Sequence, residues 1–178
     1  FLAFTIFKLE DIYTELNAEK QILIKRKLLL NQQYFTSRIK RIDSYREAIS
    51  QTINIGKAIG DSFIWIFYQN DRRLLNKHFS KQRIGHIKYN LGGKGELAFI
   101  KNFKLIDNNF IIYHGITTLL RYGDFSLYSF RNKCVSAIGE IKTLKLNEGK
   151  LELLVHLIAV KKNGLTISKP TNLNILPN

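Results

Sequence analysis

A carboxylate, one intervening residue and a lysine end an apolar run at residues 137–142, which reads AIGEIK. If this run is a strand, its side chains alternate between two faces, so Glu140 and Lys142 project from the same side. A second acid, Asp124, stands earlier in the chain at the start of another apolar run. Two carboxylates and an ammonium group that meet at a strand end can hold a divalent metal ion beside a polarised water. Such a group of side chains suits the hydrolysis of a phosphodiester bond.

The elements that would position these residues lie in the second half of the chain. Apolar runs bounded by turn signals predict strands at residues 110–114, 124–130 and 134–143. Residues 151–160 are apolar enough for either a buried strand or a helix, and we favour a strand. Asp124 would then lie on the strand next to the one that carries Glu140 and Lys142.

Glu96 is a fourth candidate and follows a glycine-rich stretch at residues 89–96. We interpret this stretch as a flexible loop that leads into a short helix. Glu96, Phe99 and Phe103 recur at helical spacing, so Glu96 is expected to face inward with apolar neighbours. An inward carboxylate needs a partner, and a metal ion would be one. The alternative is an acid in the first helical turn that interacts favourably with the helix dipole.

The first part of the chain has a different pattern. Residues 9–54 carry an apolar stripe at helical spacing and no glycine or proline, which predicts two long helices or a helical hairpin. A second helical segment is predicted at residues 56–79, although its centre is apolar on every side and is equally compatible with a strand. We therefore divide the chain into a helical region, residues 1–80, and an α/β core, residues 81–178. The helical region would act as an arm that packs on the core or on a second copy.

The charge balance favours an anionic partner. Lys and Arg total 28 and Asp and Glu total 14, which gives a net charge of +14. Such an excess is typical of proteins that bind nucleic acid, and a solvated basic surface is the alternative. We expect DNA as the partner, with RNA left open. The residues that we predict to contact it are Arg72, Arg73, Lys77, Lys81, Arg83, Lys88 and Lys94.

Cysteine content and hydropathy bear on the compartment. The single cysteine, Cys134, rules out an internal disulfide and fits a reducing compartment, so we predict a cytoplasmic protein. No apolar stretch reaches the length of a membrane span, and we predict no membrane partner. The apolar residues 1–7 lack a basic leader and a cleavage site, so we expect no signal peptide there.

Taken in order, a helix with Glu96, a strand, a strand opening with Asp124 and a strand carrying Glu140-Ile141-Lys142 resemble the PD-(D/E)XK nuclease superfamily. The resemblance covers roughly residues 85–160 and leaves the helical region outside. Gly123 stands where the family's name places a proline. The resemblance implies a restriction-endonuclease-like fold, in which helices flank a central mixed sheet.

The resemblance also implies a role for each site residue. Asp124 and Glu140 would bind Mg²⁺, or Mn²⁺ in its place, together with the backbone carbonyl of Ile141. Lys142 would orient or help to deprotonate the attacking water and stabilise charge on the phosphate. Glu96 would reach the metal through water or hold a second ion. The implied function is a Mg²⁺-dependent endonuclease that acts on DNA, with restriction or anti-phage defence as its setting.

Two other functions remain open. The chain could be a nucleic-acid-binding or assembly module that keeps a nuclease-like fold without cutting. It could instead be an interaction protein whose N-terminal helices form a homodimer. On either reading, Glu140 and Lys142 are a solvated pair at a strand end, and Asp124 is a turn residue favoured by the preceding glycine.

Overall fold

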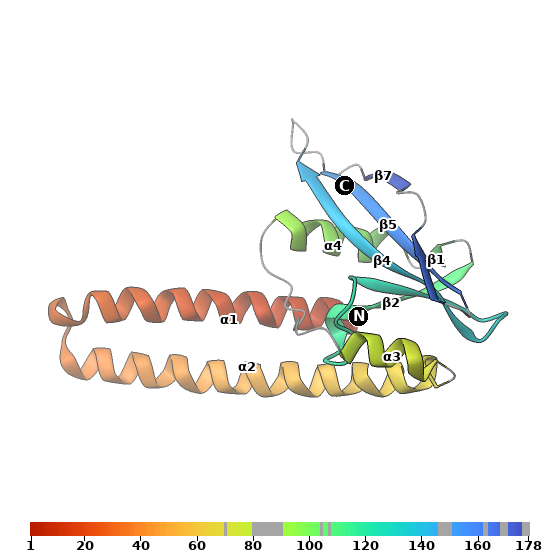
Figure 1. Cartoon of the computed structure of the whole chain (residues 1–178). Helices are drawn as coiled ribbons and strands as arrows, with labels where there is room; N and C mark the ends of the chain where they lie inside the picture. The colour runs from red at the N-terminus through yellow and green to blue at the C-terminus, as the bar shows by residue number, and fades with distance from the viewer. Residues whose placement is uncertain are drawn as a thin grey trace. The chain divides into compact units, whose positions relative to one another are not determined.

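The computed structural model of the chain describes residues 1–69, 71–79, 91–103, 105–106, 108–145, 151–161, 164–167 and 171–175. The chain divides into two compact units, Phe1–Lys57 and Ala58–Asn178. The first unit is helical and the second combines helices with a sheet, so the predicted mixture of helices and strands is confirmed (Figure 1). The division falls at residue 57, which assigns part of the predicted helical region 1–80 to the unit that contains the sheet.

A helical hairpin forms the first unit. Helix α1 (Leu2–Lys25) is followed by the 3-10 helix η1 (Lys27–Leu29) and by helix α2 (Gln32–Phe67), which continues into the second unit. The hairpin confirms the prediction from the uninterrupted apolar stripe. Helix α2 runs on through Gly56, where a Cβ atom would lie 3.2 Å from Cγ1 of Ile6. A glycine at this position therefore lets the two helices approach closely.

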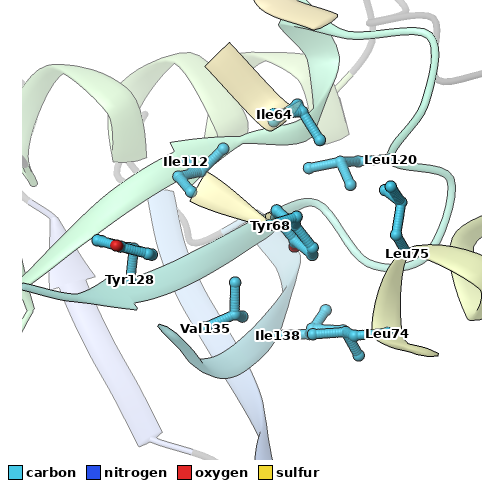
Figure 2. Packing of buried hydrophobic residues seen from close by; sticks show 9 residues of the cluster. All are labelled: Ile64, Tyr68, Leu74, Leu75, Ile112, Leu120, Tyr128, Val135 and Ile138. Carbon is cyan, nitrogen blue, oxygen red and sulfur yellow. The ribbon is translucent and has the colours of Figure 1, made fainter. Parts of the chain in front are cut away.

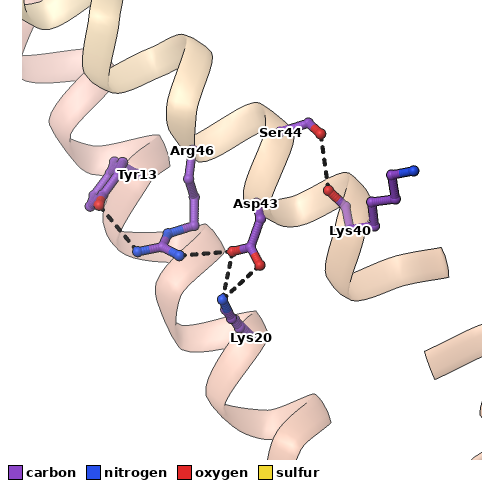
Figure 3. Close-up of polar contacts among 6 residues, drawn as sticks. All are labelled: Tyr13, Lys20, Lys40, Asp43, Ser44 and Arg46. Atoms are coloured by element: carbon purple, nitrogen blue, oxygen red, sulfur yellow. Dashed lines mark hydrogen bonds and ion pairs between the residues drawn. The ribbon is translucent and has the colours of Figure 1, made fainter. Parts of the chain in front are cut away.

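Polar contacts between α1 and α2 fix how the two helices pair (Figure 3). The Asp43 carboxylate accepts hydrogen bonds from Lys20 at 2.6 and 2.8 Å and from Arg46 at 2.9 Å. Arg46 also donates to the Tyr13 hydroxyl at 3.1 Å. The hydrogen bond from Lys20, supported by Arg46, holds the pKa of Asp43 below its ordinary value. Such partly exposed contacts set the register of the helices more than they stabilise the fold.

An antiparallel sheet forms the centre of the second unit. Its order is β1-β2-β3-β4-β5-β6, and β7 pairs with the other half of β5. The strands are β1 (Leu105–Ile106), β2 (Asn109–Tyr113), β3 (Phe125–Ser129), β4 (Cys134–Lys145), β5 (Leu151–Lys161), β6 (Gly164–Ile167) and β7 (Thr171–Ile175). The four strands predicted between residues 110 and 160 are therefore present.

The sheet differs from the mixed sheet that the resemblance implied. Every strand pair in the described part of the chain is antiparallel. Short connections between several successive strands contribute to this arrangement, such as the tight turn at residues 130–133 between β3 and β4. A short turn can join only antiparallel neighbours, because a parallel pair needs a crossover of a dozen residues or more.

Helix α4 (Leu91–Asn102) covers one face of the sheet. Its buried Phe99 packs with strand residues, which are Phe125, Leu127, Ala137, Ile141, Leu153 and Val155. The predicted glycine-rich loop is wrong from residue 91 onward, because these glycines lie inside α4. A Cβ atom on Gly95 would lie 1.8 Å from Oγ1 of Thr143 in β4. The glycine is therefore needed for close packing of helix on strand, which local sequence cannot reveal.

The end of α2 and helix α3 (Arg72–Phe79) cover the opposite face. Figure 2 shows this second core, in which helical and strand side chains meet. The helices contribute Ile64, Tyr68, Leu74 and Leu75, and the strands contribute Ile112, Tyr128, Val135 and Ile138. Periodicity alone could not decide whether the apolar segment 63–68 is a strand or a helix. The segment is helical up to Phe67, and Ile64 and Tyr68, which are four residues apart, both face this core.

Candidate functional site

Asp124 lies at the point where β3 begins and is fastened to β4. Its backbone N–H donates to the carbonyl of Gly139 at 2.7 Å, and its carboxylate accepts the N–H of Ile141 at 2.6 Å. The carboxylate thus accepts a hydrogen bond that a backbone carbonyl would accept in a regular sheet. It stands beside the backbone of the central residue of the Glu140-Ile141-Lys142 triplet, on the strand that pairs with β3.

Gly123 explains how the chain turns into this position. Its φ angle is +74°, a value that proline cannot adopt because its ring holds φ near −65°. A Cβ atom on Gly123 would lie 2.6 Å from Cγ2 of Ile138 and 2.7 Å from the Gly139 carbonyl oxygen. The glycine in place of the family's proline is therefore a requirement of this turn.

Glu140 and Lys142 project from the same face of β4, as the strand period predicted. Both are exposed, whereas Ile141 between them is buried against α4. The N–H of Ile141 points towards the end of β3, where it meets Asp124. In an antiparallel strand the carbonyl of a residue points to the same side as its N–H. The predicted backbone ligand therefore also faces the side of Asp124.

Glu96 is not brought to this group. It lies on α4, and its carboxylate accepts a hydrogen bond from the hydroxyl of Tyr113 in β2. Tyr113 is the register partner of Phe125, whose side chain packs under α4. Glu96 and Tyr113 thus occupy the α4 face, and the sheet separates them from the face that carries Glu140 and Lys142. The partner that an inward-facing Glu96 was predicted to need is the hydroxyl of Tyr113.

His156 is a site neighbour that the sequence did not indicate. It lies on β5 directly opposite Glu140, so both side chains occupy one face of the sheet. Its Nε2 atom is buried and finds no hydrogen-bond partner among the described residues. Cross-strand register, which a single sequence does not contain, is the signal that would have found His156.

A buried hydrogen-bond network holds the backbone of the turn that carries Asp124. The His114 ring bonds to the Gly123 carbonyl through Nδ1 at 3.1 Å and to Oγ of Ser126 through Nε2 at 2.6 Å. A carbonyl can only accept, so Nδ1 carries the proton and Nε2 accepts from Ser126. The Tyr68 hydroxyl completes the network at 2.6 Å from the same Oγ. The backbone N–H of His114 also donates to the Asp124 carbonyl at 2.9 Å.

Burial keeps the two histidines of this region neutral. It lowers the pKa of His114 to about 3, and the neighbouring His78 acts in the same direction. Burial also lowers the pKa of His78 to about 4. His78 accepts the backbone N–H of Tyr122 at 3.2 Å, and its ring lies edge-on to that of His114. These contacts make His114 a structural residue beside the turn at Asp124.

The predicted nucleic-acid contacts fall on two elements. Arg72, Arg73 and Lys77 are exposed on α3, which packs on the same face as Glu140 and Lys142. Lys94 is exposed on α4, on the other face. The remaining predictions lie outside the described residues, and these are Lys81, Arg83 and Lys88. Of the predicted contact residues that the structure describes, those on α3 share a face with the candidate site.

The donor set fits a metal ion that keeps water and substrate ligands. Within the described part of the chain, no group of three or more His, Cys, Asp or Glu side chains could hold an ion. Asp124 and Glu140 supply two carboxylates from neighbouring strands. Mg²⁺ accepts such a pair when waters and a substrate phosphate fill the other positions of its octahedron. Two carboxylates are too few to complete an octahedron, so an ion at this site would need water and substrate ligands.

Comparisons with known proteins add no family. No protein-family model, no curated protein and no solved structure matches the chain. Of the helices that the structure describes, none combines the length and the apolar character required to cross a bilayer.

Proposed function

We propose that the chain is a Mg²⁺-dependent endonuclease that hydrolyses phosphodiester bonds in DNA. The single observation that carries the proposal is the fastening of the Asp124 carboxylate to the N–H of Ile141 at 2.6 Å. The contact ties Asp124 to the strand segment that carries a second acid and a lysine, Glu140 and Lys142, which share an exposed face. The finer proposal is a restriction-endonuclease-like core, and the β2-β3-β4 meander with its acid before β3 supports it.

Each side chain has a role that follows from its place. Asp124 and Glu140 would hold the ion, which when bound would polarise the phosphate and lower the pKa of a coordinated water. Lys142 lies on the face of Glu140, so its ammonium group can orient the attacking water and meet the charge that develops on the phosphate. The α3 cations on this face would bind the DNA backbone, and binding would then weaken steeply with salt.

Cleavage of supercoiled plasmid with and without Mg²⁺ tests the proposal. Asp124→Asn suits the test because an asparagine oxygen can still accept the Ile141 N–H while the charge is lost. We expect Asp124→Asn, Glu140→Gln and Lys142→Met each to reduce cleavage by at least about 100-fold, the scale of a lost ligand or its support. DNA binding at low salt should be kept.

Two control variants match the chemistry without touching the site. Glu15→Gln removes an exposed carboxylate of α1, and Lys101→Met removes an exposed lysine of α4. Both should cleave like the wild type. Cleavage that survives in all three site variants, or that falls equally in the controls, would contradict the assignment. Mg²⁺ should also raise the melting temperature of the wild type, because a ligand of the folded state stabilises it.

A non-catalytic nucleic-acid-binding module is the second candidate. It is favoured by the structural use of two of the three predicted site carboxylates, since Asp124 caps a backbone N–H and Glu96 bonds to Tyr113. This candidate predicts salt-sensitive DNA binding that Arg72→Gln and Arg73→Gln weaken, with no cleavage under any metal. The plasmid assay therefore separates the two functions.

A further inference from the structure

Helix α2 presents large apolar side chains to solvent on the part that belongs to the second unit. Ile59 is 48% exposed, Phe63 47%, Trp65 57% and Ile66 58%. We call these four residues the α2 apolar face. The opposite side of the same helix buries Ile64 in the core. A helix that is apolar on both sides is normally covered on both, and a cluster of exposed apolar side chains commonly marks an interaction site.

The helical period gathers this face into one continuous surface. Ile59, Phe63 and Ile66 follow one another at four and three residues, so they line a single stripe. Ala58 and Ser62 lie between this stripe and Trp65, and both are exposed. Small residues beside large ones provide the hollows into which side chains of another helix can pack.

This surface also lacks charge. The exposed residues between positions 58 and 69, all of them in the described part of the chain, are Ala58, Ile59, Ser62, Phe63, Trp65, Ile66 and Gln69. None is ionisable, in a chain in which 24% of residues are charged. Asp61 lies in the same stretch but is half-buried and accepts hydrogen bonds from Thr117 and Thr118.

We propose that the α2 apolar face binds a second copy of this chain in an antiparallel helix pair. The charge distribution selects this occupant. Two copies that each carry +14 repel each other, so they can meet only where neither presents charge. A two-fold contact brings residues near the axis close to their own symmetry mates, so a charged group there would face an identical charge. A different partner would be free to use acidic groups against this basic protein.

Helical spacing fixes a self-complementary register for the pair. A two-fold axis between positions 62 and 63 sets Ile59 against Ile66 of the second copy and Phe63 over Ser62 of the second copy. The contact is short, because the ten helical residues from position 58 to the end of α2 at Phe67 span about 15 Å. It is smaller than a standard interface of roughly 800 Å² per partner, so we expect a dissociation constant in the micromolar range. This inference does not depend on nuclease activity.

Sedimentation equilibrium and the emission of Trp65 test the pairing together. Trp65 is the single tryptophan of the chain, so its fluorescence reports this surface without other contributions. We expect the mass to double and the emission to shift to the blue over the same range of concentration. Added salt should tighten the dimer, because it screens the repulsion between two cationic copies. DNA binding would change with salt in the opposite direction.

Charge placed at the axis gives a sharper test that leaves every apolar side chain in place. Ser62→Arg and Ser62→Asp should each lower self-association at least tenfold, because each variant faces its own charge. An equimolar mixture of the two should recover the dimer through opposite charges. As a matched control, the double variant Leu28→Ser with Leu29→Ser removes two leucines that are 98% and 85% exposed in the hairpin. It should dimerise like the wild type.

Three results would overturn the proposal. One is a monomer with solvent-like tryptophan emission at the highest concentration reached. Another is a dimer that persists in Ser62→Arg but is lost in the Leu28 and Leu29 control. The third is a monomer whose emission shifts only on neutral phosphatidylcholine vesicles, which would assign the face to a lipid surface.

Discussion

The helical hairpin and the sheet-containing unit hold their polar groups in opposite ways. In the hairpin, polar contacts such as Lys20 with Asp43 lie at the rim of the helix pair and remain partly exposed. In the sheet unit, Tyr68, His114 and Ser126 form a network inside the core, where the Ser126 side chain has no exposed surface. Water can replace a lost partner at the rim but not in the core. Apart from the buried ion pair of Lys57 with Glu10 at 3.1 Å, the hairpin is therefore expected to tolerate polar substitution, whereas the sheet unit, which carries the candidate site, is not.

The largest effect is expected from His114→Ala. The substitution leaves a cavity and removes the partners of Ser126 and of the Gly123 carbonyl, so we expect a loss of about 3 kcal/mol or more in unfolding free energy. Urea denaturation followed by Trp65 emission measures it. His114→Asn retains a donor for the Gly123 carbonyl and should lose less. Equal stability of His114→Ala and the wild type would remove the contrast between the two units.

Acid should destabilise the sheet unit before the hairpin. The folded pKa values of His78 and His114, about 4 and about 3, lie below the ordinary value of 6.5, so the unfolded chain binds more protons between these limits. Their contribution is complete above pH 6.5 and is lost as the pH falls towards 4. The slope is about 1.4 kcal/mol per pH unit for each histidine. Urea denaturation of wild type and His78→Gln at pH 7 and pH 5 should show a smaller pH effect in the variant.

Gly95→Ala tests whether α4 depends on its close approach to β4. The added Cβ would lie 1.8 Å from Oγ1 of Thr143, so helix or strand must shift. We expect a loss of about 1–3 kcal/mol, the usual cost of overpacking, although alanine favours helix more than glycine. The paired variant Gly95→Ala with Thr143→Ala should recover much of the loss. A stabilised Gly95→Ala would instead place α4 further from the sheet.

The smallest effect is expected from Arg38→Gln in the hairpin. Arg38 pairs with Glu19 at 2.6 Å, and both side chains are 37% exposed. Exposed pairs of this kind contribute about 0.2–1 kcal/mol, and salt screens them. Thermal unfolding at low and high salt should therefore show a small difference that disappears at high salt. A loss as large as that of His114→Ala would break the proposed distinction between rim and core.

Predictions from sequence succeeded where the signal is local. The apolar stripe without glycine or proline indicated the hairpin, and apolar runs between turn signals indicated β2 to β5. They failed at Gly92 to Gly95, where flexibility was inferred although these glycines lie within α4. They also failed to connect Glu140 with His156, because two residues on neighbouring strands are related by register and not by spacing.

The order of residues is enough to define the helices of the hairpin, the strands of the meander and the shared face of Glu140 and Lys142. These follow from backbone periods of 3.6 and 2 residues, which are written directly into the order of side chains. Only the tertiary structure decided that Asp124 meets Ile141, that Glu96 turns to Tyr113 on the other face, and that Gly123 must have a positive φ angle. Such facts depend on which segments pack together, and packing is a property of the whole chain.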